Sequence, residues 1–170
     1  MAQIFRRVCS VVYVDDNFEN QIQFQDATLR TGTSFQIRPL FSAESALAYL
    51  TYLTLQQPEQ QHSLPAFLLC DFAFQAGRGC GLVAAIRFIP SYADLIIIML
   101  SDFHQGRSVA QSYSVGVNHF LRKPLTETRL DILVKALYSC ATLYPPRFES
   151  LVRLPEYLRC PEPVPAFSLT

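Results

Sequence analysis

The chain has 170 residues, of which 50% are hydrophobic and 16% charged, and 14 basic side chains balance 14 acidic ones. This length and composition predict one compact domain with a substantial core, and they exclude a disordered chain, which would be less hydrophobic and more charged. The zero net charge gives no electrostatic attraction to nucleic acid or to an anionic membrane surface.

The cysteines and the N-terminal segment bear on the cell compartment. The five cysteines are odd in number and no two have the C-x-x-C spacing, so neither a disulfide framework nor a zinc knuckle is expected. The apolar run after Arg6 and Arg7 ends at Asp15 and Asp16 without the small-residue site of a signal peptide, and no apolar stretch reaches membrane-spanning length. We therefore predict a soluble, cytoplasmic protein that binds neither nucleic acid nor membrane.

The first part of the chain alternates between strand-like and helix-like segments. A β-branched run at residues 8–14 predicts a strand that ends in two aspartates, and residues 17–30 predict a helix. The apolar face expected for this helix is formed by Phe18, Ile22 and Leu29. A weaker strand is expected at 35–40, before a helix that Ser42 can cap.

The same alternation continues to residue 144. A polar loop is expected at 56–64, and the continuous apolar run 66–70 predicts a strand that ends at Asp71. Glycines at 77, 79 and 81 predict a flexible turn before a short helix at 82–88. The last predicted elements are a strand at 95–100, a weak helix at 104–115, a strand at 117–121 and an amphipathic helix at 126–144.

Strands that alternate with helices predict a doubly wound α/β fold, in which a five-stranded parallel sheet carries helices on both faces. We place this domain at residues 1–144. The proline-rich segment 145–170 is a tail too short for an output domain, and the sequence leaves open whether it crosses to a second subunit, packs on its own domain or stays loose.

Polar side chains follow the predicted strands at the carboxyl edge of the sheet, where ligands bind in such folds. Three carboxylates close together raise one another's pKa unless a cation neutralises them, and Mg²⁺ is the oxygen-seeking cation that fits. Lys123 adds a positive charge and Ser101 a hydroxyl, which together form a phosphoryl-transfer site with a carboxylate nucleophile. The residues of this predicted site are Asp15, Asp16, Asp71, Ser101 and Lys123.

The spacing of these residues resembles that of the CheY-like receiver domains of response regulators, over roughly residues 8–144. Gly79 lies 8 residues after Asp71, Ser101 lies 30 after it, and Lys123 begins a Lys-Pro pair 52 after it. Ile86 and Arg87 also stand where the family has the same pair. The resemblance implies the flavodoxin-like strand order 2-1-3-4-5 and a cis peptide bond between Lys123 and Pro124.

The resemblance also implies roles for the site residues. Asp71 would be the phosphoacceptor, Asp16 would bind Mg²⁺ directly, and Asp15 would bind it through water. The backbone carbonyl of Ala73 would be a further ligand, and Lys123 would pair with Asp71 or its phosphoryl group. Ser101 and Phe120 would form the switch, in which Ser101 moves toward the phosphoryl oxygens as the aromatic ring rotates inward.

The partners that the resemblance implies are a sensor histidine kinase or a histidine phosphotransfer protein, together with a downstream protein target. A homodimer through the last helix and the fifth strand is a further possibility of the family. The chain would catalyse only its own phosphorylation and dephosphorylation. The loop 56–64 is longer than typical and resembles that of phytochrome-associated single-domain regulators.

Three positions depart from the family pattern and leave other functions open. Gln75 replaces the usual proline, Ala73 is small where the family is often polar, and Phe103 is bulky enough to shield an acyl phosphate, which predicts slow self-dephosphorylation. The alternative function is a pseudo-receiver that binds proteins without phosphorylation. A hydrolase of the haloacid-dehalogenase type needs a second aspartate two residues after the nucleophile, where this chain has Ala73.

Overall fold

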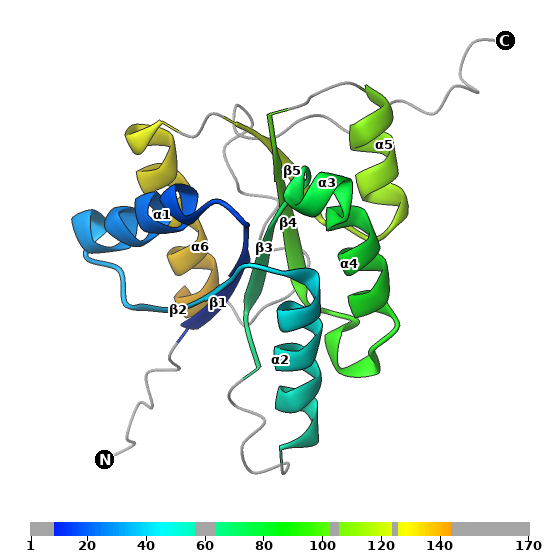
Figure 1. Ribbon diagram of the computed structural model, residues 1–170. Coiled ribbons are helices and arrows are strands. Elements are labelled where there is room, and N and C mark those ends of the chain that lie inside the picture. Colours follow the sequence, from blue (N-terminus) through cyan, green and yellow to red (C-terminus); the bar gives the residue numbers. More distant parts are fainter. Residues whose placement is uncertain (1–8, 57–63, 103–105, 124–125, 144–170) are drawn as a thin grey trace, which may run out of the picture.

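A computed structural model gives the fold of residues 9–56, 64–102, 106–123 and 126–143 (Figure 1). Several predictions fall outside these described residues: the loop 57–63, the bulky Phe103, the peptide bond to Pro124 and the tail 145–170. Within the described part of the chain, no helix is both long and apolar enough to cross a membrane.

Five parallel strands form one sheet in the order β2-β1-β3-β4-β5, which confirms the predicted fold class and strand order. The strands are β1 Cys9–Val14, β2 Phe35–Leu40, β3 Phe67–Asp71, β4 Ile96–Ser101 and β5 His119–Arg122. The helices are α1 Phe18–Thr31, α2 Ala43–Leu55, α3 Phe74–Gly77, α4 Gly79–Arg87, α5 Gly106–Ser114 and α6 Glu127–Leu143, with a 3-10 turn at Pro90–Tyr92.

The helices cover both faces of the sheet and so create two cores (Figure 1). Helices α1 and α6 pack over one face, with Phe24 and Leu133 in that core. Helices α2, α4 and α5 pack over the other, with Leu50 and Ile86. Every residue of β3 and of β4 is buried, which explains why the apolar runs in these two strands do not alternate with polar residues.

Two helices begin where the sequence supplies a capping side chain. The Asn17 carboxamide oxygen accepts a hydrogen bond from the backbone amide of Glu19 at the start of α1. Ser42 and Ser45 form a reciprocal capping box at the start of α2, which confirms the predicted cap. Both caps lie at the carboxyl edge of the sheet, so they fix the start of the helices that surround the strand ends.

The predicted flexible glycine turn before residue 82 is wrong. Helices α3 and α4 follow one another almost without interruption from Phe74 to Arg87. Gly79 starts α4 against the end of β3, where a Cβ atom would lie 2.6 Å from the backbone oxygen of Asp71. Close approach of the helix to the strand, rather than flexibility, therefore accounts for the glycine at position 79.

We expect Gly79→Ala to lower the free energy of unfolding by about 1–3 kcal/mol, because the methyl group collides with backbone atoms of Asp71 and Phe72. The matched control is Gly81→Ala in the same helix, since a Cβ there meets nothing within 4 Å. Gly81→Ala should raise stability by up to about 1 kcal/mol through helix propensity. Urea denaturation of the two variants checks the contrast, and equal effects would contradict it.

Phe18, Ile22 and Leu29 do fall on one face of α1, as predicted, but that face is not the buried one. Phe18, Ile22 and Leu29 are 65%, 41% and 73% exposed. The buried face instead consists of Gln21, Phe24, Ala27 and Thr28. Phe24 packs edge-on against Tyr13 of β1, and this contact orients the helix so that the larger apolar set faces outward.

Candidate functional site

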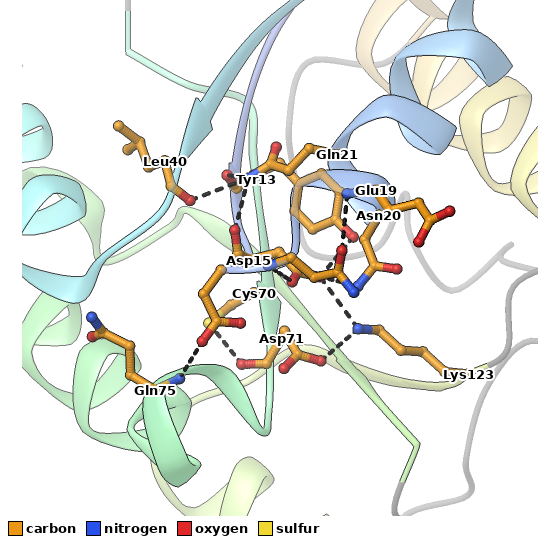
Figure 2. Close-up of polar contacts among 12 residues, drawn as sticks. Tyr13, Asp15, Glu19, Asn20, Gln21, Leu40, Cys70, Asp71, Gln75 and Lys123 are labelled. Atoms are coloured by element: carbon orange, nitrogen blue, oxygen red, sulfur yellow. Dashed lines mark hydrogen bonds and ion pairs between the residues drawn. The ribbon is translucent and has the colours of Figure 1, made fainter.

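Lys123 joins two buried carboxylates at the carboxyl edge of the sheet (Figure 2). Its Nζ lies 2.6 Å from Oδ1 of Asp71 and 3.3 Å from Oδ2 of Asp15. Asp71 is the last residue of β3 and is only 5% exposed. The structure thus brings together three of the predicted site residues: Asp15 after β1, Asp71 at the end of β3 and Lys123 after β5.

Asp15 is held by four donors, which makes it the most constrained carboxylate of the site. Its Oδ2 accepts from Tyr13 Oη (3.2 Å), Asn20 Nδ2 (2.9 Å) and Lys123 Nζ (3.3 Å). Its Oδ1 accepts from the backbone amide of Asn17 (2.9 Å). The sequence reasoning missed Tyr13 and Asn20, although residues two apart on a strand share a face, and this spacing could have pointed to Tyr13.

Tyr13→Phe is expected to lower the free energy of unfolding by about 0.5–1.5 kcal/mol, because it removes one buried hydrogen bond while three other donors stay on Asp15. Tyr52→Phe is the matched control, since Tyr52 is exposed on α2 and its hydroxyl should matter by less than about 0.5 kcal/mol. Chemical denaturation of both variants tests the difference. An equal loss in both variants would show that the bond to Asp15 adds nothing.

Asp16 faces solvent beside the loop that follows β3. Its Oδ2 accepts a hydrogen bond of 3.1 Å from the backbone amide of Gln75. Gln75 has a positive φ of 45°, which side-chain-bearing residues rarely adopt, and its Oε1 accepts from the amide of Ala43 at the start of α2. At the position where the family usually has proline, Gln75 therefore links an acidic site residue to a helix N-terminus.

Burial and charge act in opposite directions on the central ion pair. Burial raises the pKa of the Asp71 carboxyl, and Asp15 adds to the rise, while the hydrogen bond and charge of Lys123 oppose it. For Lys123, burial lowers the pKa, but the bonds and charges of Asp71 and Asp15 outweigh it and raise the pKa overall. Lys123 is therefore positively charged. Without Lys123, burial would destabilise the negative charge on the Asp71 carboxylate.

The two predicted switch residues lie on neighbouring strands, β4 and β5. Ser101 ends β4 and is completely buried, and its carbonyl accepts the backbone amide of Lys123 at 2.8 Å. Phe120 of β5 is also completely buried and packs edge-on against Phe72 with ring centroids 6.1 Å apart. The aromatic ring already occupies the inward position, and its rotation as Ser101 moves stays a prediction.

The chemistry of the donor set fits Mg²⁺. Among the described residues, no group of three His, Cys, Asp or Glu side chains is arranged to hold a metal. Mg²⁺, however, is usually bound through one or two carboxylates and keeps several waters. Asp71 and the exposed Asp16 offer that set, and the backbone of Ala73 follows two residues after Asp71.

Comparisons with known proteins agree with this fold. No protein-family model matches the chain. The probable chemotaxis protein CheY of Rhizobium etli is 25% identical over 128 residues, which cover 75% of this chain and 91% of that protein.

Solved structures with a similar fold include those of response regulators. A response regulator in red light signalling of R. palustris is 20% identical and has a TM-score of 0.66. The match covers 78% of this chain and 92% of that protein's chain. The Mn²⁺-bound form of response regulator Rcp1 is 22% identical, with coverages of 79% and 94% and a TM-score of 0.62.

The strand order is that of the CheY-like fold, and acidic residues stand at the ends of its strands. The chain is therefore similar in fold to CheY-like receiver domains, and similar in sequence to the probable CheY of Rhizobium etli.

Proposed function

We propose that this chain is a response-regulator receiver of two-component signalling, and that it is a phosphorylation switch in which Asp71 is the nucleophile. The proposal rests on one distance: Lys123 Nζ lies 2.6 Å from Oδ1 of Asp71, a buried carboxylate at the end of β3. A lysine at that distance can neutralise charge on the carboxylate and later on a phosphoryl group bound to it.

The proposed reaction transfers a phosphoryl group from a phosphohistidine of a sensor kinase or phosphotransfer protein. An oxygen of Asp71 forms the new O–P bond, the N–P bond of the donor breaks, and the leaving imidazole takes up a proton. Lys123 remains protonated and pairs with a phosphoryl oxygen, and the Ser101 hydroxyl can donate to another. Mg²⁺, when held by Asp16 and Asp71, would supply charge neutralisation to the same oxygens.

The proposed output is docking to a downstream protein after Ser101 and Phe120 rearrange. The similarity in fold to a response regulator in red light signalling makes a sensor kinase of red light signalling the first donor to test. The Mn²⁺-bound form of Rcp1 supports a divalent cation as cofactor. The homodimer through α6 and β5, the cytoplasmic location and the absence of catalysis on other substrates stay predictions.

A pseudo-receiver that binds its target without phosphate is the second candidate. The observation in its favour is Gln75, which has a positive φ of 45° and whose backbone amide donates a hydrogen bond to Asp16, one of the predicted metal ligands.

Acetyl phosphate with Mg²⁺ separates the two functions. We expect the full chain to gain the mass of one phosphoryl group and to show amide NMR shifts that reach Ser101 and Phe120. When EDTA is added before acetyl phosphate, we expect no mass gain. A folded protein that takes up no phosphoryl group and shows no shifts would refute the switch and favour the pseudo-receiver.

A further inference from the structure

An apolar groove of about 400 Å³ lies between α1 and the edge strand β2, away from the carboxylate site. On one side it is formed by the outward face of α1, and on the other by the side chains of β2 that point toward α1. Among the residues that the structure describes, no charged side chain lines it. Its main apolar walls are Phe18, Ile22, Leu29, Phe35, Ile37 and Phe41.

The α1–β2 groove has the apolar character of an interaction surface. Phe18, Ile22 and Leu29 are the large exposed apolar residues of α1, and all three line the groove. A contiguous exposed apolar surface of this kind marks an interaction site.

The chain leaves its last helix at one end of the groove. Helix α6 packs beside α1, and Arg30 pairs with Asp131 at 2.8 Å between them. Near the other end of α6, the Tyr138 ring packs edge-on against Phe35, which lines the groove, with centroids 5.4 Å apart. Helix α6 ends at Leu143, about one helical turn beyond Tyr138.

We propose that residues 148–158 of the same chain occupy the α1–β2 groove. The segment reads FESLVRLPEYL, with six apolar or aromatic side chains among eleven residues, and it begins five residues after Leu143. Helix α1 has 14 residues, so the groove beside it is roughly 21 Å long, which six or seven extended residues span. The 27 residues that follow Leu143 are therefore sufficient to cross the end of α1 and fill the groove.

A tethered occupant is favoured over a second copy of the chain. A segment joined by a short linker has an effective concentration in the millimolar range, which a separate molecule does not reach under ordinary conditions. Edge-to-edge pairing of two β2 strands is also hindered, because Pro39 lies within β2 and has no N–H to donate.

Site-specific photo-cross-linking in the full chain tests the proposal. The probe p-benzoylphenylalanine replaces Leu29, which is 73% exposed in the groove, or in the control Leu55, which is 77% exposed at the end of α2. From position 29 we expect cross-links within one chain to the tryptic peptides FESLVR and LPEYLR. Cross-links between chains, cross-links to residues 1–8, equal yields from both positions or no cross-link would overturn the proposal.

A substitution in the tail provides the second arm, since it leaves the described domain unchanged. With the probe at position 29, Leu151→Asp should reduce the yield of the intrachain cross-link at least tenfold, because a carboxylate is costly in an uncharged groove. Ser150→Asp, one residue earlier, should leave most of the yield. If both variants cross-link like the parent chain, residues 148–158 are not the occupant.

Discussion

Asp71→Asn is expected to abolish phosphoryl uptake from acetyl phosphate, because the neutral carboxamide is a poor nucleophile and no longer forms the ion pair in which Lys123 Nζ lies 2.6 Å from Oδ1. Asp94→Asn is the matched control, since Asp94 is an exposed aspartate in the loop before the amino end of β4, away from the carboxyl edge of the sheet. It should label as fully as the parent chain. Intact mass of the three proteins after identical incubation measures the difference.

The result distinguishes a specific acceptor from general reactivity. If Asp71→Asn still gains a phosphoryl group, another side chain is the acceptor, and peptide mapping would identify it. Far-ultraviolet circular dichroism must show the fold of the parent chain in the variant. Under that condition, loss of labelling in Asp71→Asn alone assigns the chemistry to the end of β3.

Lys123→Ala is expected to lower the free energy of unfolding by about 3–5 kcal/mol near neutral pH, because it leaves the buried carboxylates of Asp71 and Asp15 without their shared cation. Lys135→Ala on the exposed face of α6 is the matched control and should change stability by less than about 0.5 kcal/mol. Urea denaturation at several pH values measures both.

The pH dependence of Lys123→Ala follows from the direction of the Asp71 shift. Burial raises the folded-state pKa of Asp71 above its ordinary 3.8, and the loss of Lys123 removes the main influence that lowers it. Between the ordinary and the raised pKa the folded state binds more protons than the unfolded state, so stability falls as pH rises. The deficit of Lys123→Ala should therefore shrink as the pH is lowered toward 4.

The same experiment has an alkaline side. The folded-state pKa of Lys123 is raised, so its contribution to stability is fully present below the ordinary value of 10.5 and is lost as pH rises through the folded-state pKa. The parent chain and Lys123→Ala should therefore converge at high pH as well as at low pH. A deficit that stays constant from acid to alkaline pH would mean that lost packing, and not charge, causes it.

Local sequence patterns were sufficient for the order of elements and for most of the site. The apolar runs of β3 and β4 do not alternate, and only burial on both faces of a parallel sheet accommodates them. The ends of β1, β3 and β5 carry charged residues directly in the sequence, so Asp15, Asp71 and Lys123 meet once the strands are parallel. Composition and periodicity thus determined the fold class, and strand-end chemistry determined the carboxylate–lysine pair.

Tertiary packing decided which face of α1 is buried. The helix carries two candidate faces, and periodicity favoured the one with Phe18, Ile22 and Leu29. In the structure Gln21 lies inward instead and donates to the carbonyl oxygens of Tyr13, Asp15 and Leu40, at 3.1–3.2 Å. Those acceptors exist only after β1 and β2 have paired, so no pattern within the helix could reveal them.

The partners of Asp15 and Asp16 were likewise a tertiary outcome. Tyr13 and Asn20 converge on Asp15 because a strand and the helix after it fold back on each other. Gln75 reaches Asp16 because its backbone has a positive φ, which the sequence did not signal at a residue other than glycine. The sequence by itself determined which chemistry the sheet edge carries. Contacts between elements distant in the chain decided how each carboxylate is held and which apolar surface stays open, because their energies exist only in the packed structure.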